Sequence, residues 1–356
     1  MHRSTGSAQG RKPALLIFSY VMFALACRND ATMSPLHQLL STPTEYTLVL
    51  SSEATHAPLL SARFTEAGDH IVVLSGMAPF VKVFARNGSL ERSFLPKGGG
   101  PEEMLAPYAL ATKGDSLLLV VDVSGSVRVY TLQGKQIASA RIPMQVSTVA
   151  SACESKWVLI GPYAANSGAP PSWIHELSLT TVGDTALVRS WLPQDPSPAW
   201  RPTYGRPHGI TEKDGRISFL MDFVQPATVG NWDCSSEHLA STPIPAWEDD
   251  RVIAEGRETE SKGRAQRVLP GTRVSGGIAR VGGFLIISAF TIGSSEKDSR
   301  TLFRLIGEGK DIAADVPGVY TFLDTKPGAG ILLLDVVNER VFAVDERDFV
   351  QALISN

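Results

Sequence analysis

The chain has 356 residues and 43% hydrophobic content, enough to bury a large core, and its formal net charge of −3 carries no bias toward nucleic acid. Only 19% of the residues are charged, whereas glycine (31) and proline (23) are numerous. This composition is typical of many short strands joined by tight turns, so we expect an all-β protein rather than a helical bundle.

Residues 1–27 have the features of a secretory signal peptide, in which basic residues precede an apolar run from Ala14 to Ala26. The run is too short to cross a bilayer comfortably. Its end, FALAC, resembles the lipobox of bacterial lipoproteins, in which cleavage leaves Cys27 as the lipidated N-terminus. Ala24 departs from the leucine that this family prefers, and a plain signal cleaved near Ala26 is the alternative. For a lipoprotein, Arg28 after the cysteine favours the outer membrane; a secreted or periplasmic protein is the other possibility.

Residues 28–44 are polar and contain two prolines, so we expect a tether between the anchor and a folded domain that spans 45–356. Tyr46–Ser51 follows as a strand with no partner strand next to it in the sequence.

Two copies of one pattern lie between Gly68 and Tyr130. In each copy an apolar run is followed by an alternating run, a glycine-containing turn and another extended segment. The apolar runs are Ile71–Leu74 and Leu117–Val121, and the turns are Asn87-Gly88 and Gln133-Gly134. Each copy predicts a four-stranded antiparallel meander, with the apolar run as its buried inner strand.

Four further copies follow, and the six open near Gly68, Gly114, Glu154, Asp214, Gly282 and Gly328. Propeller blades repeat at roughly 40 to 50 residues, so we predict a six-bladed β-propeller, with seven blades if 193–207 contains strands. The last blade takes its outer strand from Phe349–Ile354 or from Tyr46–Ser51, and the latter would close the ring. Trp247–Gln266 is charged and rich in helix formers, which predicts a short helix outside the propeller.

Between the first two copies, the stretch from Phe94 to Met104 reads FLPKGGGPEEM. It resembles the Gly-x-Gly-Pro-Gly-Glu-Phe stretch of a bacterial family of six-bladed β-propellers related to the NHL-repeat proteins, many of them lipoproteins. Glu102 replaces the glycine after the proline, and Met104 replaces the aromatic residue. The resemblance implies the fold and a cell-envelope compartment for about residues 45–350, and it implies no activity.

The segment WRPTYGRPHG, before the fourth copy, concentrates two arginines, a histidine and two aromatic residues. Loops that enter inner strands open onto the central funnel of a propeller, so Arg201, Arg206 and His208 could face an anionic ligand. A proline-stiffened crossover with packed aromatic residues is the alternative. Sugars could stack on three further aromatic residues, for which burial between blades is the alternative: Tyr163, Trp173 and Trp232.

Asp122, Asp222 and Asp335 each end an apolar run, and a ring of carboxylates around the funnel could bind Ca²⁺. We favour a structural use, in which each carboxylate accepts backbone N–H bonds from the next turn. Cys153 and Cys234 fall in different repeats, so we expect two thiols rather than a disulfide. The sequence contains no metal-binding spacing, and we expect no cofactor.

These features predict a lipid-anchored, monomeric, non-catalytic propeller that presents its loops to a protein or small-molecule ligand. The alternative is a propeller-type enzyme, a lactonase or lyase, with a metal in the central funnel. Such enzymes need several converging histidines or carboxylates, and the chain has only seven histidines.

Overall fold

The structure, a computed structural model, describes the chain in thirteen stretches: 33–41, 49–51, 59–142, 146–152, 156–163, 172–179, 186–193, 208–213, 216–221, 228–233, 238–243, 273–291 and 298–356. The contacts divide the chain into two units, Met1–Met33 and Ser34–Asn356, and all the helices and strands named here belong to the second unit.

The described residues form six four-stranded antiparallel sheets. Within a sheet, strands that follow one another in the chain are neighbours, apart from the strand that the N-terminal part adds to the last sheet. The first three sheets are β2 (Leu59–Phe64), β3 (His70–Ser75), β4 (Val81–Ala85) and β5 (Leu90–Phe94); β6 (Pro107–Lys113), β7 (Leu117–Asp122), β8 (Ser126–Thr131) and β9 (Gln136–Arg141); and β10 (Thr148–Ser151), β11 (Lys156–Tyr163), β12 (Ser172–Ser178) and β13 (Ala186–Pro193). The other three are β14 (His208–Lys213), β15 (Arg216–Met221), β16 (Thr228–Asp233) and β17 (His238–Pro243); β18 (Arg273–Val281), β19 (Phe284–Thr291), β20 (Arg300–Gly307) and β21 (Lys310–Pro317); and β22 (Tyr320–Lys326), β23 (Gly330–Asp335) and β24 (Arg340–Val344) with β1 (Val49–Ser51).

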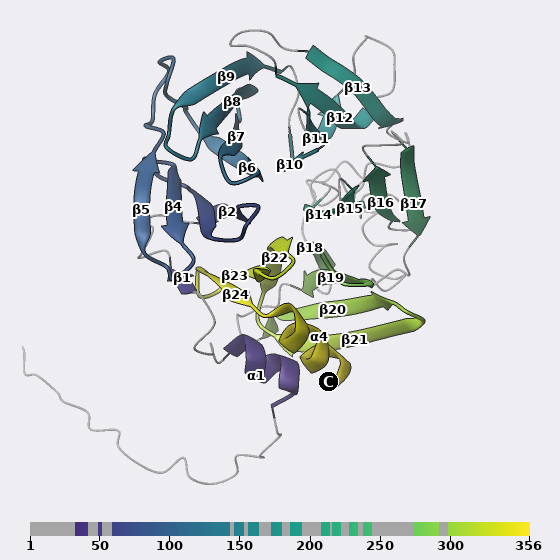
Figure 1. The fold of residues 1–356 in the computed structure, drawn as a ribbon. Coiled ribbons are helices and arrows are strands. Elements are labelled where there is room, and N and C mark those ends of the chain that lie inside the picture. Colours follow the sequence, from purple (N-terminus) through teal and green to yellow (C-terminus); the bar gives the residue numbers. More distant parts are fainter. Residues whose placement is uncertain are drawn as a thin grey trace, which may run out of the picture. The chain divides into compact units, whose positions relative to one another are not determined.

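The first strand of each meander contacts the first strand of the next one. β2 contacts β6, β6 contacts β10, β10 contacts β14, β14 contacts β18, β18 contacts β22, and β22 contacts β2. These six strands are therefore the innermost strands, and Figure 1 shows the sheets arranged around them. The prediction of an all-β propeller built from four-stranded antiparallel sheets is confirmed.

β1 supplies the outermost strand of the last sheet. It pairs antiparallel with β24, Val49 opposite Phe342 and Ser51 opposite Arg340, and Leu50 is buried between the sheets. Of the two segments that the sequence leaves open for this position, Phe349–Ile354 lies in helix α4 (Glu346–Ile354) instead.

The prediction that the apolar runs are inner strands is wrong. Ile71–Leu74 lies in β3 and Leu117–Val121 in β7, and each is the second strand of its sheet. A second strand has neighbours on both edges and sheets on both faces, so its sequence is continuously apolar. The innermost strand has a free edge at the centre and carries polar residues such as Arg63 and Thr112. Because of these polar residues, the innermost strands are hard to distinguish from loops in the sequence.

Two helices pack together at the periphery, where Figure 1 shows α1 (Pro35–Ser41) beside α4. One apolar cluster holds the buried side chains of both helices together with aromatic residues of β20 and β22, namely Leu36, Leu40, Phe349, Leu353, Phe303 and Phe322. The tether predicted for 28–44 is therefore wrong at Pro35–Ser41, because an apolar pair one turn apart docks this segment on the domain. The helix expected at Trp247–Gln266 lies outside the described residues.

The glycine-rich linker after β5 is a loop that closes on itself. The amide of Gly98 donates to the carbonyl of Met104 at 3.0 Å, and the amide of Gly100 donates to Glu103 Oε2 at 2.9 Å. A Cβ at Gly98 would displace the Glu103 carboxylate, so glycine at this position leaves room for the Glu103 side chain to fold back onto the loop. Met104, which replaces the aromatic residue of the motif, is buried in the apolar core between the first two sheets. Its side chain therefore has a packing role.

Candidate functional site

The innermost strands of all six sheets begin at one end of the sheets and finish at the other, and the two ends carry different connections. We call the end at which the innermost strands begin the loop end, and the end at which they finish the turn end. Contacts between the turns of neighbouring sheets place the turn ends together. Lys326 Nζ lies 2.7 Å from Glu66 Oε1, and the amide of Ala67 donates to Asp115 Oδ1 at 2.6 Å.

The long connections of the chain begin and finish at the loop end. Connections between sheets that start and end there include 95–106, 194–207 and 244–272, and connections within sheets include 164–171. At the turn end, the longest connection between two strands is 179–185. Since binding residues of propellers and other rigid scaffolds concentrate on long loops, the loop end is the candidate binding face.

His208 is the first residue of β14, an innermost strand, and pairs with Leu220 of β15. It therefore lies at the loop end, where the connection 194–207 finishes. Arg201 and Arg206, predicted to act with His208, fall within that connection and lie outside the described residues, as does the lipidation candidate Cys27.

Of the aromatic residues considered for sugar stacking, Trp232 is completely buried in β16, so a stacking role for it is wrong. Tyr163 and Trp173 belong to β11 and β12, and their side chains lie outside the described residues, as do Cys153 and Cys234.

Two of the three aspartates considered for calcium have a structural use. Asp122, only 1% exposed, accepts from the amides of Ala106 and Ser124 at 2.7 and 2.8 Å. Burial alone would raise the pKa of Asp122, but these donors outweigh it and hold the pKa below its usual value. Asp335 accepts from the Asn338 amide and pairs with Arg340 Nε at 2.9 Å. Asp222 lies outside the described residues.

Polar side chains from three innermost strands meet at the free edge of β2. The amide of Phe64 donates to Asp324 Oδ2, from β22, at 2.7 Å. The hydroxyl of Thr112, from β6, donates to the carbonyl of Phe64 at 2.6 Å. Both backbone groups of Phe64 at this edge are thus satisfied by side chains from the two neighbouring sheets. We call Arg63, Phe64, Thr112 and Asp324 the axial group.

The axial group contains one cation and one carboxyl. Arg63 is 9% exposed, and its guanidinium makes no hydrogen bond and no ion pair within 4.0 Å among the described residues. Burial raises the pKa of the Asp324 carboxyl, although the charge of Arg63 and the Phe64 amide oppose the rise. We did not identify Arg63 or Asp324 from the sequence. The one feature of the sequence that could have identified them is a single charged residue in an apolar segment, Arg63 in LLSARF and Asp324 in YTFLD.

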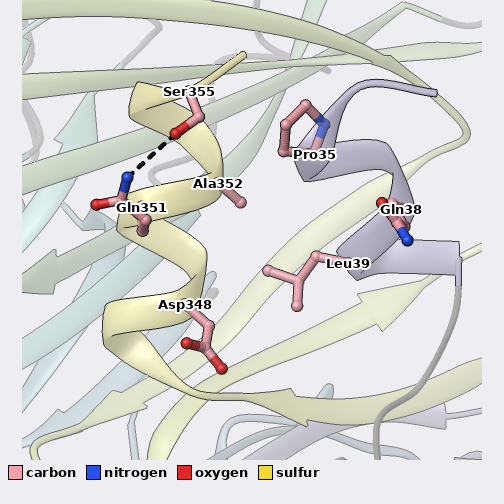
Figure 2. Close-up of a pocket in the computed structure, with 7 residues that line it drawn as sticks. All are labelled: Pro35, Gln38, Leu39, Asp348, Gln351, Ala352 and Ser355. Carbon is pink, nitrogen blue, oxygen red and sulfur yellow. Dashed lines mark hydrogen bonds between the residues drawn. The ribbon is translucent and has the colours of Figure 1, made fainter. Parts of the chain in front are cut away.

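An open groove of about 450 Å³ lies between α1 and α4. Figure 2 shows the side chains that line it. Gln351 Nε2 donates to Ser355 Oγ at 3.1 Å on one wall. The groove is lined by Pro35, Gln38, Leu39, Asp348, Gln351, Ala352 and Ser355. This lining offers no base next to a nucleophile.

In the part of the chain that the structure describes, no three His, Cys, Asp or Glu side chains are close enough to hold a metal ion. None of the described helices has the length and apolarity to cross a membrane.

No protein-family model matches the chain, and neither does any curated protein. Among solved structures, it is similar to Kuenenia stuttgartiensis hydrazine synthase at 12% identity and a TM-score of 0.52, over 84% of this chain and 80% of that chain. A protein from Bacteroides fragilis NCTC 9343 described as exported is similar at 11% identity and a TM-score of 0.52, over 78% of each chain. The β-propeller domain of Cps50 (Swd1) from Myceliophteria thermophila matches at 12% identity and a TM-score of 0.47, over 84% of this chain and 99% of that domain. At these identities the likeness concerns the fold alone.

Proposed function

We propose that this chain is a non-catalytic binding module of the cell envelope, held to the membrane by lipid on Cys27, that binds an anionic ligand at its loop end. The observation that carries the proposal is the concentration of long connections at the loop end, one of which finishes at His208. The module acts as a monomer and does not bind nucleic acid.

In this proposal each of the six sheets is one blade, and β1 closes the ring by pairing with β24. Further contacts join the last sheet to the first and support closure. Arg86 Nη2 donates to the carbonyls of Gly328 and Ala329 at 3.3 and 3.1 Å, and Lys326 pairs with Glu66. A closed ring has no open seam between its first and last blades.

The position of Cys27 supports the envelope location and, with Arg28 after it, the outer membrane. The FALAC sequence and the NHL-like propeller resemblance both suggest a lipoprotein, and the likeness to a protein described as exported agrees. Because α1 begins at Pro35, the tether in this proposal is only residues 28–34. Two or three acyl chains, at about 0.8 kcal/mol per buried methylene, anchor such a domain stably.

The anionic ligand is held by Arg201 and Arg206, whose planar guanidinium groups match carboxylate or phosphate oxygens, with His208 as a further donor. His208 is the first residue of an innermost strand, so its backbone lies beside the centre at the loop end. Residues of such a loop contribute little to the packing of the blade cores, so they can be substituted without unfolding the domain.

The test is a screen of anionic metabolites and envelope glycans against the wild type and an Arg201→Ala/Arg206→Ala variant. We expect the variant to lose binding, at about 1–3 kcal/mol per lost contact, and to keep its melting temperature. The control is Arg92→Ala/Arg347→Ala, which removes the same charge from exposed positions on β5 and α4. A lower melting temperature with an unchanged ligand profile would instead assign the two arginines to the packing of a stiff crossover.

A further inference from the structure

We propose a second binding site, for a carboxylate group, at the centre of the turn end, with the guanidinium of Arg63 as its cation. The site goes beyond the proposed function because none of its residues comes from the loop end.

The position of the site follows from the strand directions. Arg63 is the fifth of the six residues of β2, and Asp324 and Thr112 lie in the last three residues of β22 and β6. Each of these strands finishes at the turn end. The hydrogen bonds from Phe64 to Asp324 and from Thr112 to Phe64 bring the three strand ends together beside Arg63.

Arg63 differs from three partly buried arginines in the described residues, each of which donates to an acceptor of the chain. Arg280 Nη2 donates to Ser218 Oγ and Asn231 Oδ1 at 3.2 and 3.1 Å. Arg340 pairs with Asp335, and Arg128 Nη2 donates to the carbonyl of Gly100 at 3.2 Å.

Arg63 has nine-tenths of its surface covered and five N–H donors, yet no hydrogen-bond acceptor from the described residues. No nitrogen of Arg63 is among the described buried side-chain atoms that lack a partner, so the guanidinium reaches solvent and its donors are open to an external acceptor.

A carboxylate fits the surroundings of Arg63 better than a phosphate does. The planar fork of a guanidinium binds both oxygens of a carboxylate in parallel. The Asp324 carboxyl lies nearby, and a doubly charged phosphate would be repelled by it when it is ionised. Because burial raises the pKa of Asp324, its carboxyl can instead share a proton with a bound carboxylate, as two close carboxyl groups do.

Two sources could supply the carboxylate, a small organic acid or the C-terminus of a peptide. The probes are succinate, a tripeptide with a free C-terminus, the same tripeptide with an amidated C-terminus, and inorganic phosphate. Succinate alone identifies a small acid, whereas binding of the free but not the amidated tripeptide identifies a peptide end. Tighter binding of phosphate than of either carboxylate would overturn the proposal.

Calorimetric titration of the full chain in detergent measures these affinities in the wild type and in Arg63→Met, which keeps the length of the side chain but not its charge. We expect at least a tenfold loss of affinity in Arg63→Met. The matched control Arg92→Met, at an exposed position on β5, should bind like the wild type. Equal binding by Arg63→Met and the wild type, or no binding of any carboxylate by the wild type, would overturn the proposal.

A second measurement does not depend on whether Arg63→Met folds. In the wild type, the bound carboxylate should shift the amide resonance of Phe64, because this amide donates to Asp324 next to the site. An unshifted Phe64 resonance at saturating succinate and tripeptide would contradict the proposal. The Arg201→Ala/Arg206→Ala variant should still bind the carboxylate, so failure of the loop-end site and failure of this one are distinguishable.

Discussion

Asp324 joins two neighbouring sheets, because its partly buried carboxyl accepts from the amide of Phe64. Burial raises the pKa of its carboxyl in the folded protein, against the opposing charge of Arg63. The folded state therefore binds a proton more readily than the unfolded chain does. The stability that comes from Asp324 is present below the unfolded pKa of about 3.9 and is lost as the pH rises through the folded pKa.

We predict that Asp324→Asn becomes progressively more stable than the wild type as the pH rises. Asparagine can still accept from the Phe64 amide, but it has no charge to bury. Thermal unfolding of both proteins between about pH 4 and about pH 8 measures the difference.

Asp311→Asn is the control for this pH dependence, because a hydrogen bond from Arg304 lowers the pKa of Asp311 and its pH trend should be opposite or absent. A difference between Asp324→Asn and the wild type that does not change with pH would contradict the prediction.

At the scale of elements, the two ends of the chain complete the domain. β1 adds the outer strand to the last sheet, and α1 packs on α4 over β20 and β21. Asp345 caps α4 by accepting from the amides of Arg347 and Asp348 at 2.8 and 3.2 Å, and Glu346 and Asp348 suit the positive N-terminus of the helix.

We predict that deletion of residues 46–51 lowers the melting temperature by on the order of 10 °C, since loss of a buried leucine alone costs about 2–5 kcal/mol. This deletion removes Leu50, which is 1% exposed, and uncovers the edge of β24. Calorimetry compares it with deletion of 28–34, which leaves β1 intact and removes from α1 only the cap that Ser34 makes to the amides of His37 and Gln38, so it should lower the melting temperature much less. Equal melting temperatures for the two deletions would argue against ring closure by β1.

At the scale of the whole molecule, the proposed function attaches the protein to the membrane through the lipid on Cys27. We predict that Cys27→Ser either releases the protein from membranes or leaves an uncleaved precursor. Fractionation under high salt, followed by mass analysis of the N-terminus, measures both outcomes. Wild-type processing together with retention on membranes in the variant would contradict the lipoprotein hypothesis.

The sequence by itself determined the class of the fold. Apolar second strands such as Ile71–Leu74 and the turn Asn87-Gly88, in which Gly88 has φ of 86°, are recognisable because strand period and turn chemistry are local properties of the chain. The sequence placed His208 in a loop before the fourth repeat, whereas His208 is the first residue of the innermost strand β14.

The tertiary structure alone decided which strands are innermost, how α1 docks and where Arg63 and Asp324 meet. Phe64 and Asp324 are 260 residues apart, and their hydrogen bond depends on the last sheet reaching the first. Leu36 and Leu40 form too short an apolar pair to predict a helix, and they are buried only because α4, from the far end of the chain, lies beside them. Such contacts depend on the arrangement of all the sheets, which no local pattern encodes.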